Sequence, residues 1–453
     1  RQAKKMSKNG GPMLLLEALT KWSAAQPDKV LYTYLKDDGS PLTSSTYAQA
    51  EARSSALANY LVENKSLNLK RGDRVLLVFE PSLHYILAFL ACVRAGLVAV
   101  PVFPPDPRKL KKDMHMFATI VADCGAKVAL TSSIYNAATK MAALKTLFAS
   151  ASSKAAWPDH LVWVTVDDVP PFMSPPKNGA STSSREVAAV QASDLAFLQY
   201  TSGSTSEPKG VMITHGNLAH NLACIIHELK AAKDTVVVSW LPQYHDMGLI
   251  GSYLGVMYCG GCGYYLSPFA FLKQPLVWLK TISKYRGTHM QAPNFGFALA
   301  VRRFDALKGK QREEFTNGGG GGADGNGKKL DLSSVRHMIN AAEPIDADSL
   351  RAFNTTFASL GLKERVVFPT YGLAEHTVFV CSGGRQVLRV SKKALEVEGK
   401  VVIVRDESEG GSTAGGGAAA VGTASPSLSL SEAAASSHSA QPSPYTSLNS
   451  EWV

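Results

Sequence analysis

Short apolar runs alternate with longer segments of helical periodicity along most of the chain. Residues 73–79 (DRVLLVF) and 97–103 (LVAVPVF) are apolar runs of strand length, and residues 82–96 (SLHYILAFLACVRAG) have the length and spacing of a helix. Gly96 stands where a left-handed residue commonly ends a helix. Strand, helix and strand in such close succession predict a βαβ unit, with the two strands parallel in one sheet.

The same pattern recurs further along the chain. Residues 117–132 and 271–293 both read as helix, glycine and strand, and we expect Gly287 to close the second helix. Residues 12–65 differ, because helices there surround a short strand pair with a turn at residues 37–39 (DDG). The overall pattern predicts an α/β protein with doubly wound sheets.

Composition marks the segments that we expect to stay outside the packed core. Residues 317–329 (NGGGGGADGNGKK) predict a flexible surface loop. Residues 407–448 are rich in Gly, Ala and Ser and lack the bulky apolar residues that offset ordering entropy, so we predict disorder there. The basic start, residues 1–11, is predicted to be disordered as well. A folded domain is therefore expected over 12–406, with 449–453 beginning a strand of a chain that continues.

Charge and cysteine usage favour a protein of a reducing compartment, and we expect a cytoplasmic location. The 47 Lys and Arg residues against 37 Asp and Glu residues give a net charge of +10, so we expect anionic substrates. The basic residues are scattered along the chain, so we expect no nucleic-acid partner. Cys259 and Cys262 have the spacing of a metal or redox pair but no second pair nearby, which favours buried thiols. The longest apolar stretch, 86–102, contains Arg94 and is too short for a membrane span.

A loop rich in hydroxyl groups joins two predicted strands, 195–200 and 210–214. Its sequence over 199–211 is QYTSGSTSEPKGV, in which two glycines let backbone N–H groups approach a ligand and Lys209 adds a positive charge. The pattern favours a phosphate cradle, although a Ser/Thr-rich surface loop would share the composition. The spacing excludes the Walker A motif, and the loop contains no G-x-G-x-x-G.

The loop resembles the signature of the adenylate-forming enzymes, which hold a nucleoside triphosphate while a carboxylate becomes an acyl adenylate. Ser206 stands where the common version has Gly, a departure that fatty acyl-AMP ligases often tolerate. The resemblance implies that the loop binds ATP and that Lys209 also acts in catalysis. The ATP-binding residues that it implies here are Thr201, Ser202, Gly203, Ser204, Thr205 and Lys209.

Two further stretches resemble the fatty acyl-AMP ligases in particular. Residues 239–251 (SWLPQYHDMGLIG) alone would read as a strand, a polar turn and the start of a helix, and residues 291–304 (QAPNFGFALAVRRF) as a core helix. The resemblance implies that His245 lies beside the reacting carboxylate as a catalytic residue, and that A-P-N-F borders an acyl tunnel. The acyl-pocket residues that it implies are Met247, Asn294 and Phe295.

Residues 338–345 (MINAAEPI) and 369–380 (PTYGLAEHTVFV) resemble the family's G-A-E-P and Y-G-x-x-E elements. Ala341 replaces the usual Gly and adds a methyl group near the purine edge. The resemblance implies that Tyr371 stacks on adenine and that Glu375 binds Mg²⁺, whereas Glu343 reads as a structural turn carboxylate. The nucleotide-binding residues that it implies here are Asn340, Ala341, Ala342, Glu343, Tyr371 and Gly372.

The resemblance extends over residues 14–404 and implies the large N-terminal domain of these enzymes. That domain has two doubly wound α/β subdomains and a partial distorted β-barrel. The small C-terminal domain and the later motifs are expected beyond residue 453, so we expect this segment alone to adenylate slowly. Residues 383–404 resemble an insertion of fatty acyl-AMP ligases that is thought to restrict the movement needed for coenzyme A to accept the acyl group.

The function that the resemblance implies is Mg²⁺- and ATP-dependent conversion of a fatty acid to its acyl adenylate, with release of pyrophosphate. The acyl group would then pass to the phosphopantetheine thiol of an acyl carrier protein. Two alternatives stay open at this point. One is a long-chain acyl-CoA synthetase, and the other is a catalytically silent acyl- or nucleotide-binding module of a larger protein.

Overall fold

A computed structural model describes residues 11–105, 110–147, 158, 160–173, 190–201, 208–317, 329–383, 388–404 and 428–429. The chain divides into two compact units, Arg1–Gly383 and Gly384–Val453, and each is described by itself. Most of the predicted loop 317–329, most of the predicted low-complexity segment 407–448 and nearly all of the basic start lie outside the described residues. The domain boundary expected at residue 406 stays a prediction.

The first unit contains a six-stranded sheet that is parallel except at one edge. Its strands, in spatial order, are β6 (Val162–Thr165), β5 (Val128–Thr131), β3 (Arg74–Leu77), β4 (Val98–Pro101), β7 (Leu195–Thr201) and β8 (Lys209–Thr214). Only β8 is antiparallel to its neighbour. The predicted βαβ unit and its parallel sheet are therefore confirmed.

An eight-stranded sheet forms the rest of the first unit. Its strands, in spatial order, are β14 (Cys381–Ser382), β13 (Val367–Tyr371), β12 (His337–Ala341), β11 (His289–Pro293), β9 (Val236–Ser239), β10 (Cys262–Tyr265), β1 (Val30–Leu35) and β2 (Pro41–Thr46). The six central strands are parallel, and β14 and β2 pair antiparallel at the edges. The carboxyl ends of the parallel strands thus meet along one edge, which is where open α/β sheets bind ligands.

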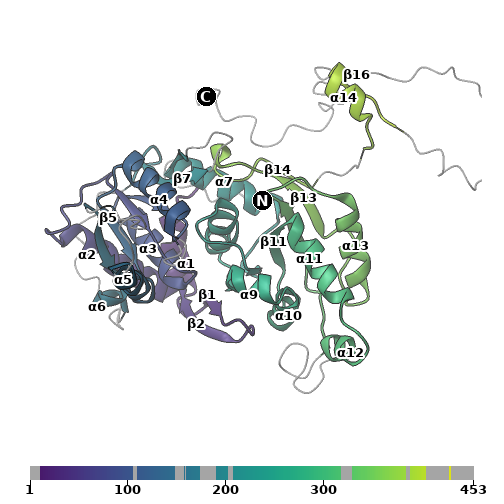
Figure 1. Ribbon diagram of the computed structural model, residues 1–453, viewed down its shortest axis with the longest axis horizontal. Coiled ribbons are helices and arrows are strands. Elements are labelled where there is room, and N and C mark those ends of the chain that lie inside the picture. Colours follow the sequence, from purple (N-terminus) through teal and green to yellow (C-terminus); the bar gives the residue numbers. More distant parts are fainter. Residues whose placement is uncertain are drawn as a thin grey trace, which may run out of the picture. The chain divides into compact units, whose positions relative to one another are not determined.

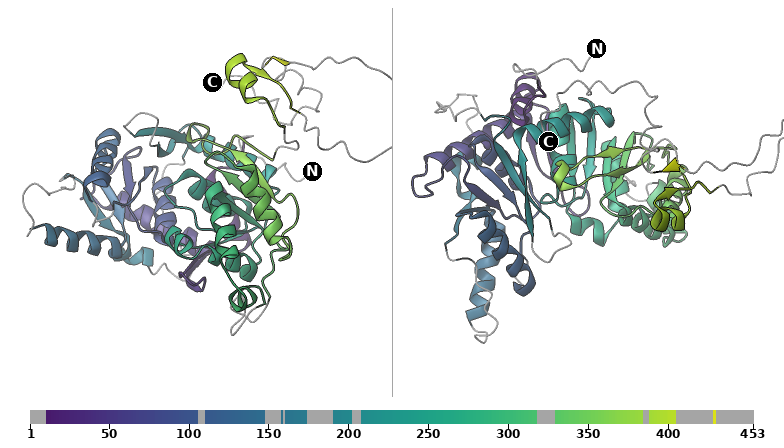
Figure 2. Two further views of the ribbon diagram at one scale, coloured as in Figure 1. Left: turned by 45° about the vertical axis from the view of Figure 1, so that its right-hand side comes forward. Right: turned by 90° about the horizontal axis from the view of Figure 1, so that it is seen from above.

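Helices pack on both sheets (Figures 1 and 2). The helices of the first unit are α1 (Leu15–Ala25), α2 (Tyr47–Glu63), α3 (Leu83–Arg94), α4 (Leu110–Cys124), α5 (Ser133–Leu147), α6 (Pro170–Met173), α7 (His215–Glu228), α8 (Gly255–Cys259), α9 (Pro268–Lys273), α10 (Leu276–Tyr285), α11 (Asn294–Asp305), α12 (Lys310–Asn317) and α13 (Ala347–Ala358). Helix α3 contacts β1 of one sheet and both β3 and β4 of the other. Because it lies between two sheets, nearly all its residues are buried, which explains why its sequence is apolar on every side.

Three short helical segments complete the first unit: η2 (Val166–Asp168), η3 (Met247–Leu254) and η4 (Ala374–His376). Segment η3 is a π-helix that runs directly into α8. At its end the N–H of Gly255 donates to the carbonyl oxygen of Ile250, five residues earlier. A π-helix is rare and is wider than an α-helix, and such segments are often found at functional sites.

Two glycines that were expected to close helices behave differently. Gly96 follows α3 with a φ of 69°, in the left-handed region, as the pattern predicts. After α10 the left-handed residue is instead Arg286, with a φ of 56°, so the prediction for Gly287 is wrong. A side chain at Gly287 would place its Cβ 2.8 Å from Cγ2 of Val238. Gly287 therefore serves the close packing of this turn on β9, and Arg286 takes the strained position.

The second unit contains α14 (Lys392–Glu398) and the antiparallel pair of β15 (Lys400–Val401) with β16 (Leu428–Ser429). The side chain of Ser391 caps α14 by accepting a hydrogen bond from the N–H of Ala394. Strand β16 falls inside the segment predicted to be disordered. The barrel-like subdomain and the insertion over 383–404 stay predictions.

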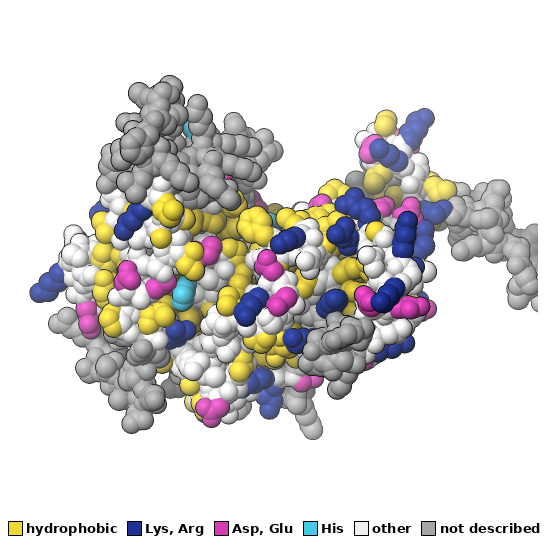
Figure 3. Space-filling model, turned by 60° about the horizontal axis from the view of Figure 1, so that its bottom comes forward, with side chains coloured by type: hydrophobic (Ala, Val, Ile, Leu, Met, Phe, Trp, Pro, Cys, Tyr) yellow, Lys and Arg dark blue, Asp and Glu magenta, His cyan; other side chains and the backbone are white. Residues whose placement is uncertain are grey.

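The surface of the protein carries charges of both signs. On the face drawn in Figure 3, Lys and Arg side chains are interspersed with Asp and Glu side chains and with apolar ones, and they form no continuous stripe there. Within the described part of the chain, no helix combines the length and the apolar character that crossing a bilayer requires.

Candidate functional site

A pocket of about 170 Å³ lies where the central strands of the eight-stranded sheet end. Strands β11, β12 and β13 supply residues at or near their carboxyl ends, and α7, η3 and the loop after η4 supply the rest. The lining residues are Ile225, His245, Asp246, Met247, Gly251, Gln291, Ile339, Ala341, Ala342, Thr370, Tyr371, Gly372, Val378 and Phe379. The position agrees with the general rule for ligand sites in open α/β sheets.

This pocket brings together residues from four of the sequence motifs, and three of these motifs supply predicted site residues. His245 and Met247 come from the turn after β9, and the others come from the ends of β12 and β13. The predicted site residues on its lining are His245, Met247, Ala341, Ala342, Tyr371 and Gly372. The side chain of Tyr371 is well exposed, so a face of its ring is open to a flat ligand.

The predicted phosphate loop is described only at its two ends. Thr201, at the end of β7, pairs with Lys209, at the start of β8. Ser202, Gly203, Ser204 and Thr205 lie outside the described residues, so the phosphate cradle stays a prediction. Strand β8 contacts η4, the segment that carries Glu375. The hairpin that holds Lys209 and the predicted Mg²⁺ ligand are therefore neighbouring elements.

Seven of the predicted site residues that the structure describes are not among the lining residues: Thr201, Lys209, Asn294, Phe295, Asn340, Glu343 and Glu375. Asn340 is fully buried, and its Nδ2 donates to Oδ1 of Asn294 at 3.0 Å. The backbone N–H of Phe295 donates to Oε1 of Glu343 at 2.6 Å. These two bonds join the start of α11 to the end of β12 and to the turn that follows it. Through these bonds Asn294, Phe295, Asn340 and Glu343 hold α11 and the end of β12 together.

Strained backbone borders the pocket on two sides. Ala342 has a φ of 71°, and Thr377 has a φ of 70° with a ψ of −60°. The N–H of Val378 donates to the carbonyl oxygen of His376 at 2.8 Å, which makes the bend at Thr377 a γ-turn of the rare, strained kind. Such conformations cost about 1–3 kcal/mol each and concentrate at functional sites. The γ-turn directs Val378 and Phe379 onto the pocket.

Helix α7 holds that same loop in place. The buried side chain of Asn221 donates from Nδ2 to the carbonyl oxygen of Phe379 at 2.9 Å and accepts from the N–H of Phe379 at 3.1 Å. The amide thus satisfies both backbone groups of one residue in the pocket wall. Since an unpaired buried backbone group is costly, this clamp fixes the loop against the helix.

His245 is paired with its neighbour in the chain. Its Nδ1 lies 2.7 Å from Oδ1 of Asp246, and the same carboxylate accepts from the N–H of Met247 at 2.6 Å. The hydrogen bond to Asp246 raises the pKa of His245 above its ordinary value of 6.5, and burial opposes this shift. The imidazole therefore stays protonated to higher pH than a free histidine and offers a positive charge at the pocket edge.

The titration of His245 can be predicted from this pair. Because its pKa is raised, the pair contributes stability that is fully present below pH 6.5 and is lost as the pH rises through the raised pKa. We expect an NMR titration of the His245 imidazole to have a midpoint above pH 6.5. As the pH rises through this midpoint, affinity for a carboxylate ligand should fall up to about fivefold. Asp246→Asn should lower the midpoint while keeping an acceptor for Met247. Asp348→Asn, on the exposed side of α13, should leave it unchanged.

The sequence motifs did not identify several of the lining residues. Ile225, in α7, is one of many apolar residues of an amphipathic helix, and nothing in its spacing marks it. Gln291 was included in a motif but was not assigned to the pocket. A buried amide in the otherwise apolar end of β11 was the available signal, because buried polar side chains usually have a specific partner.

Comparison with known proteins agrees with this geometry. The profile of the AMP-binding enzymes matches residues 19–427. The chain belongs to the AMP-binding enzyme family. The match includes all five motifs and the whole pocket, so the pocket lies within the region that the family profile matches.

Curated members of the AMP-binding enzyme family resemble this chain over most of its length. A medium-chain-fatty-acid–[acyl-carrier-protein] ligase of Moorena producens is 33% identical over 399 residues, which are 87% of this chain and 61% of that protein. Another medium-chain-fatty-acid–[acyl-carrier-protein] ligase, from Teredinibacter turnerae, is 31% identical over 411 residues, which are 83% of this chain and 58% of that protein. The chain thus spans about 60% of the length of these relatives.

Solved structures of AMP-binding enzymes share the fold. The fatty acyl-adenylate ligase from L. pneumophila, solved in complex with acyl adenylate and pyrophosphate, superposes with a TM-score of 0.69 at 30% identity. The superposition covers 87% of this chain and 62% of that one. The expected fold, the α/β large domain of adenylate-forming enzymes, is confirmed by this match and by the two sheets.

Proposed function

We propose that this chain binds ATP and a fatty acid in the 170 Å³ pocket and activates the fatty-acid carboxylate as an acyl adenylate. The observation that carries the proposal is the convergence, on one pocket, of predicted site residues from three motifs. His245 and Met247 lie on its lining together with Ala341, Tyr371 and Gly372. The exposed ring of Tyr371 would stack on adenine, and the backbone around Ala341 would follow the edge of the purine.

The reaction needs a positioned carboxylate and a stabilised leaving group. A carboxylate oxygen attacks the α-phosphorus of ATP, the bond from that phosphorus to the bridging oxygen breaks, and pyrophosphate leaves with the electron pair. The protonated His245 would hold the carboxylate at the pocket edge, and Lys209 would neutralise phosphate charge from the adjacent hairpin. Positioning and preorganised charge account for most of the rate enhancement in reactions of this type.

Glu375 suits a magnesium ion that arrives with the nucleotide. Mg²⁺ is commonly held by one or two carboxylates together with substrate phosphates and water. In the described part of the chain no three His, Cys, Asp or Glu side chains cluster as a metal site, so a resident ion held by protein alone is not indicated. When bound with ATP, Mg²⁺ would supply neutralisation of the phosphate charge, and Glu375 would orient it from η4.

The apolar part of the lining suits an alkyl chain. Ile225, Met247, Ile339, Val378 and Phe379 make up the apolar part of the lining. Each methylene buried there would contribute about 0.8 kcal/mol. Affinity should therefore rise gradually with chain length until the pocket is filled.

The acyl group would next pass to the phosphopantetheine thiol of an acyl carrier protein. The relatives from Moorena and Teredinibacter carry that acceptor in their names. The resemblance of residues 383–404 to the insertion of fatty acyl-AMP ligases favours the same acceptor over coenzyme A. An assay that offers holo carrier protein and coenzyme A separately distinguishes the two.

A non-hydrolysable acyl adenylate tests the proposal on this chain directly. We expect a medium-chain acyl sulfamoyl adenosine to bind with a Kd below about 10 μM by calorimetry and to be displaced by ATP with fatty acid. Absence of binding up to about 1 mM would refute the proposal. Binding without pyrophosphate release from ATP and a fatty acid would favour the silent-module alternative.

A further inference from the structure

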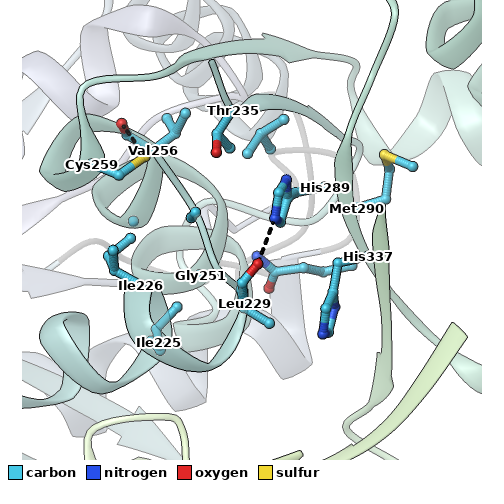
Figure 4. A pocket seen from close by; sticks show the side chains of 14 residues that line it. Ile225, Ile226, Leu229, Thr235, Gly251, Val256, Cys259, His289, Met290 and His337 are labelled. Atoms are coloured by element: carbon cyan, nitrogen blue, oxygen red, sulfur yellow. Dashed lines mark hydrogen bonds between the residues drawn. The ribbon is translucent and has the colours of Figure 1, made fainter. Parts of the chain in front are cut away.

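A second, smaller cavity of about 20 Å³ shares part of its lining with the pocket, and Figure 4 shows the side chains around this cavity. Its volume holds little more than one water molecule. The side chains around it are mostly apolar, and the polar ones are Thr235, His289, Gln291 and His337. The residues that line this inner cavity and not the outer pocket include Ile226, Leu229, Val256, Cys259, His289 and His337.

Three residues line both spaces and form the wall between them. They are Ile225 of α7, Gly251 of η3 and Gln291 of β11. A Cβ built at Gly251 would come far closer than 3.0 Å to the side-chain amide of Gln291. The amide therefore occupies the space that any side chain at position 251 would need, and it lies directly on the backbone of η3.

The Gln291 amide is not fixed by hydrogen bonds. Only 5% of the residue is exposed, yet across the described ranges the amide makes no hydrogen bond to the protein. Its truncation would consequently leave no protein donor or acceptor unpaired. The wall between the two cavities rests on packing alone, which a substitution can remove without breaking a hydrogen-bond network.

The far side of the inner cavity, by contrast, is fixed. His289 lies two residues before Gln291 on the same strand, so both side chains extend from the same face of β11. Nε2 of His289 lies 2.9 Å from the carbonyl oxygen of Leu229, and Nδ1 lies 2.9 Å from Oγ1 of Thr288. An alkyl chain that extended past Gln291 would therefore reach the imidazole of His289, which hydrogen bonds hold in place.

We propose that the side chain of Gln291 divides the acyl slot and sets the longest acyl chain that the site accepts. The inference rests on the proposed function, because it assigns the outer pocket to an alkyl chain. In the native protein the bound acyl chain ends at the amide of Gln291. In Gln291→Ala the atoms beyond Cβ are removed, the two cavities join, and the slot extends to His289.

A series of acyl sulfamoyl adenosines with chains of increasing even length tests this assignment by calorimetry. For the native protein, ligand affinity should rise about fourfold per methylene until the end of the alkyl chain reaches Gln291, and should then level off or fall. In Gln291→Ala the maximum should move to a chain longer by about two methylenes or more, with affinity for short chains unchanged within about twofold. Gln291→Val, which suits a strand, provides a second truncation if the alanine variant does not fold.

Two further variants serve as controls. Ile226→Phe, combined with Gln291→Ala, should refill the inner cavity and return the maximum to the native length, because Ile226 lines only that cavity. Gln274→Ala removes an exposed amide at the end of α9 and should change nothing.

The outcomes separate the two proposals. If every compound binds but the maximum stays at the same length in folded Gln291→Ala and Gln291→Val, the role of Gln291 is refuted and the proposed function stands. If no compound binds the native chain, the proposed function fails and this inference fails with it. A shift to longer chains that Ile226→Phe reverses supports the assignment.

Discussion

Gly372→Ala should lower affinity for an acyl-adenylate analogue by about 100-fold, or about 2.7 kcal/mol. A Cβ at this position would come far closer than 3.0 Å to the carbonyl oxygen of Val378, a separation that real structures do not show. Val378 cannot retreat, because the γ-turn at Thr377 precedes it and the clamp of Asn221 holds Phe379 after it. The pocket wall must then move. Calorimetry with a medium-chain acyl sulfamoyl adenosine measures the loss.

Gly11→Ala is the matched control for this substitution. No atom of the described residues lies within 4 Å of a Cβ built at Gly11, so the same chemical change meets none of them, and affinity should stay within about twofold. A thermal melt of each variant separates a local change from global unfolding. If Gly372→Ala kept native affinity in a folded protein, Tyr371 and the loop at Val378 would not form the wall of the binding site.

Trp278→Ala should destabilise the first unit by about 3–5 kcal/mol. Trp278 is fully buried, and its ring meets those of Phe297, Phe271 and Trp240 edge-on, with centroids 5.8, 6.0 and 6.3 Å away. The indole Nε1 has no hydrogen-bond partner among the described residues, so its removal offsets part of the loss and favours the lower end of the range. Urea unfolding followed by fluorescence and circular dichroism measures the change.

Phe269→Ala is the counterpart on the surface. Phe269 belongs to α9, the helix before α10, and is 71% exposed, so its truncation should change stability by less than about 0.5 kcal/mol. The comparison also bears on the site. Trp240 lies in the aromatic cluster and precedes the turn that leads to His245, so a collapsed cluster should weaken ligand binding as well. A loss below about 1 kcal/mol for Trp278→Ala would contradict the packing described here.

The sequence predicted the fold where local pattern and tertiary environment agree. Helix α3 is apolar on all sides because it lies between two sheets, and its flanking strands are short apolar runs, so its βαβ unit was recognisable. The end of helix α10 at Arg286 was not recognisable, because arginine rarely adopts a left-handed conformation and the residue after it is a glycine. The strained bend at Thr377 escaped prediction for the same reason, since a β-branched residue seldom adopts a positive φ.

The candidate site was predicted in part. Motif resemblance selected His245, Met247 and Tyr371, which lie on the pocket, but also Asn294 and Phe295, which are not among its lining residues. A motif records which residues stay together in a family and not the direction in which each side chain extends. The residues that close the pocket from other elements are brought to it only by the three-dimensional fold. Single positions within α7 and β11 carry no sequence signal of that convergence.

The unusual winding of η3 has a consequence for how this region can vary. A π turn holds one residue more than an α turn, so deletion of a single residue between Met247 and Leu254 would let the segment rewind as an ordinary α-helix. The residues on either side would keep their registration, because the deletion removes the extra residue of the π turn. The helix would become narrower at Gly251, whose backbone the Gln291 amide contacts. Loss of one residue, with no substitution anywhere, would thus remodel the floor on which the Gln291 amide lies.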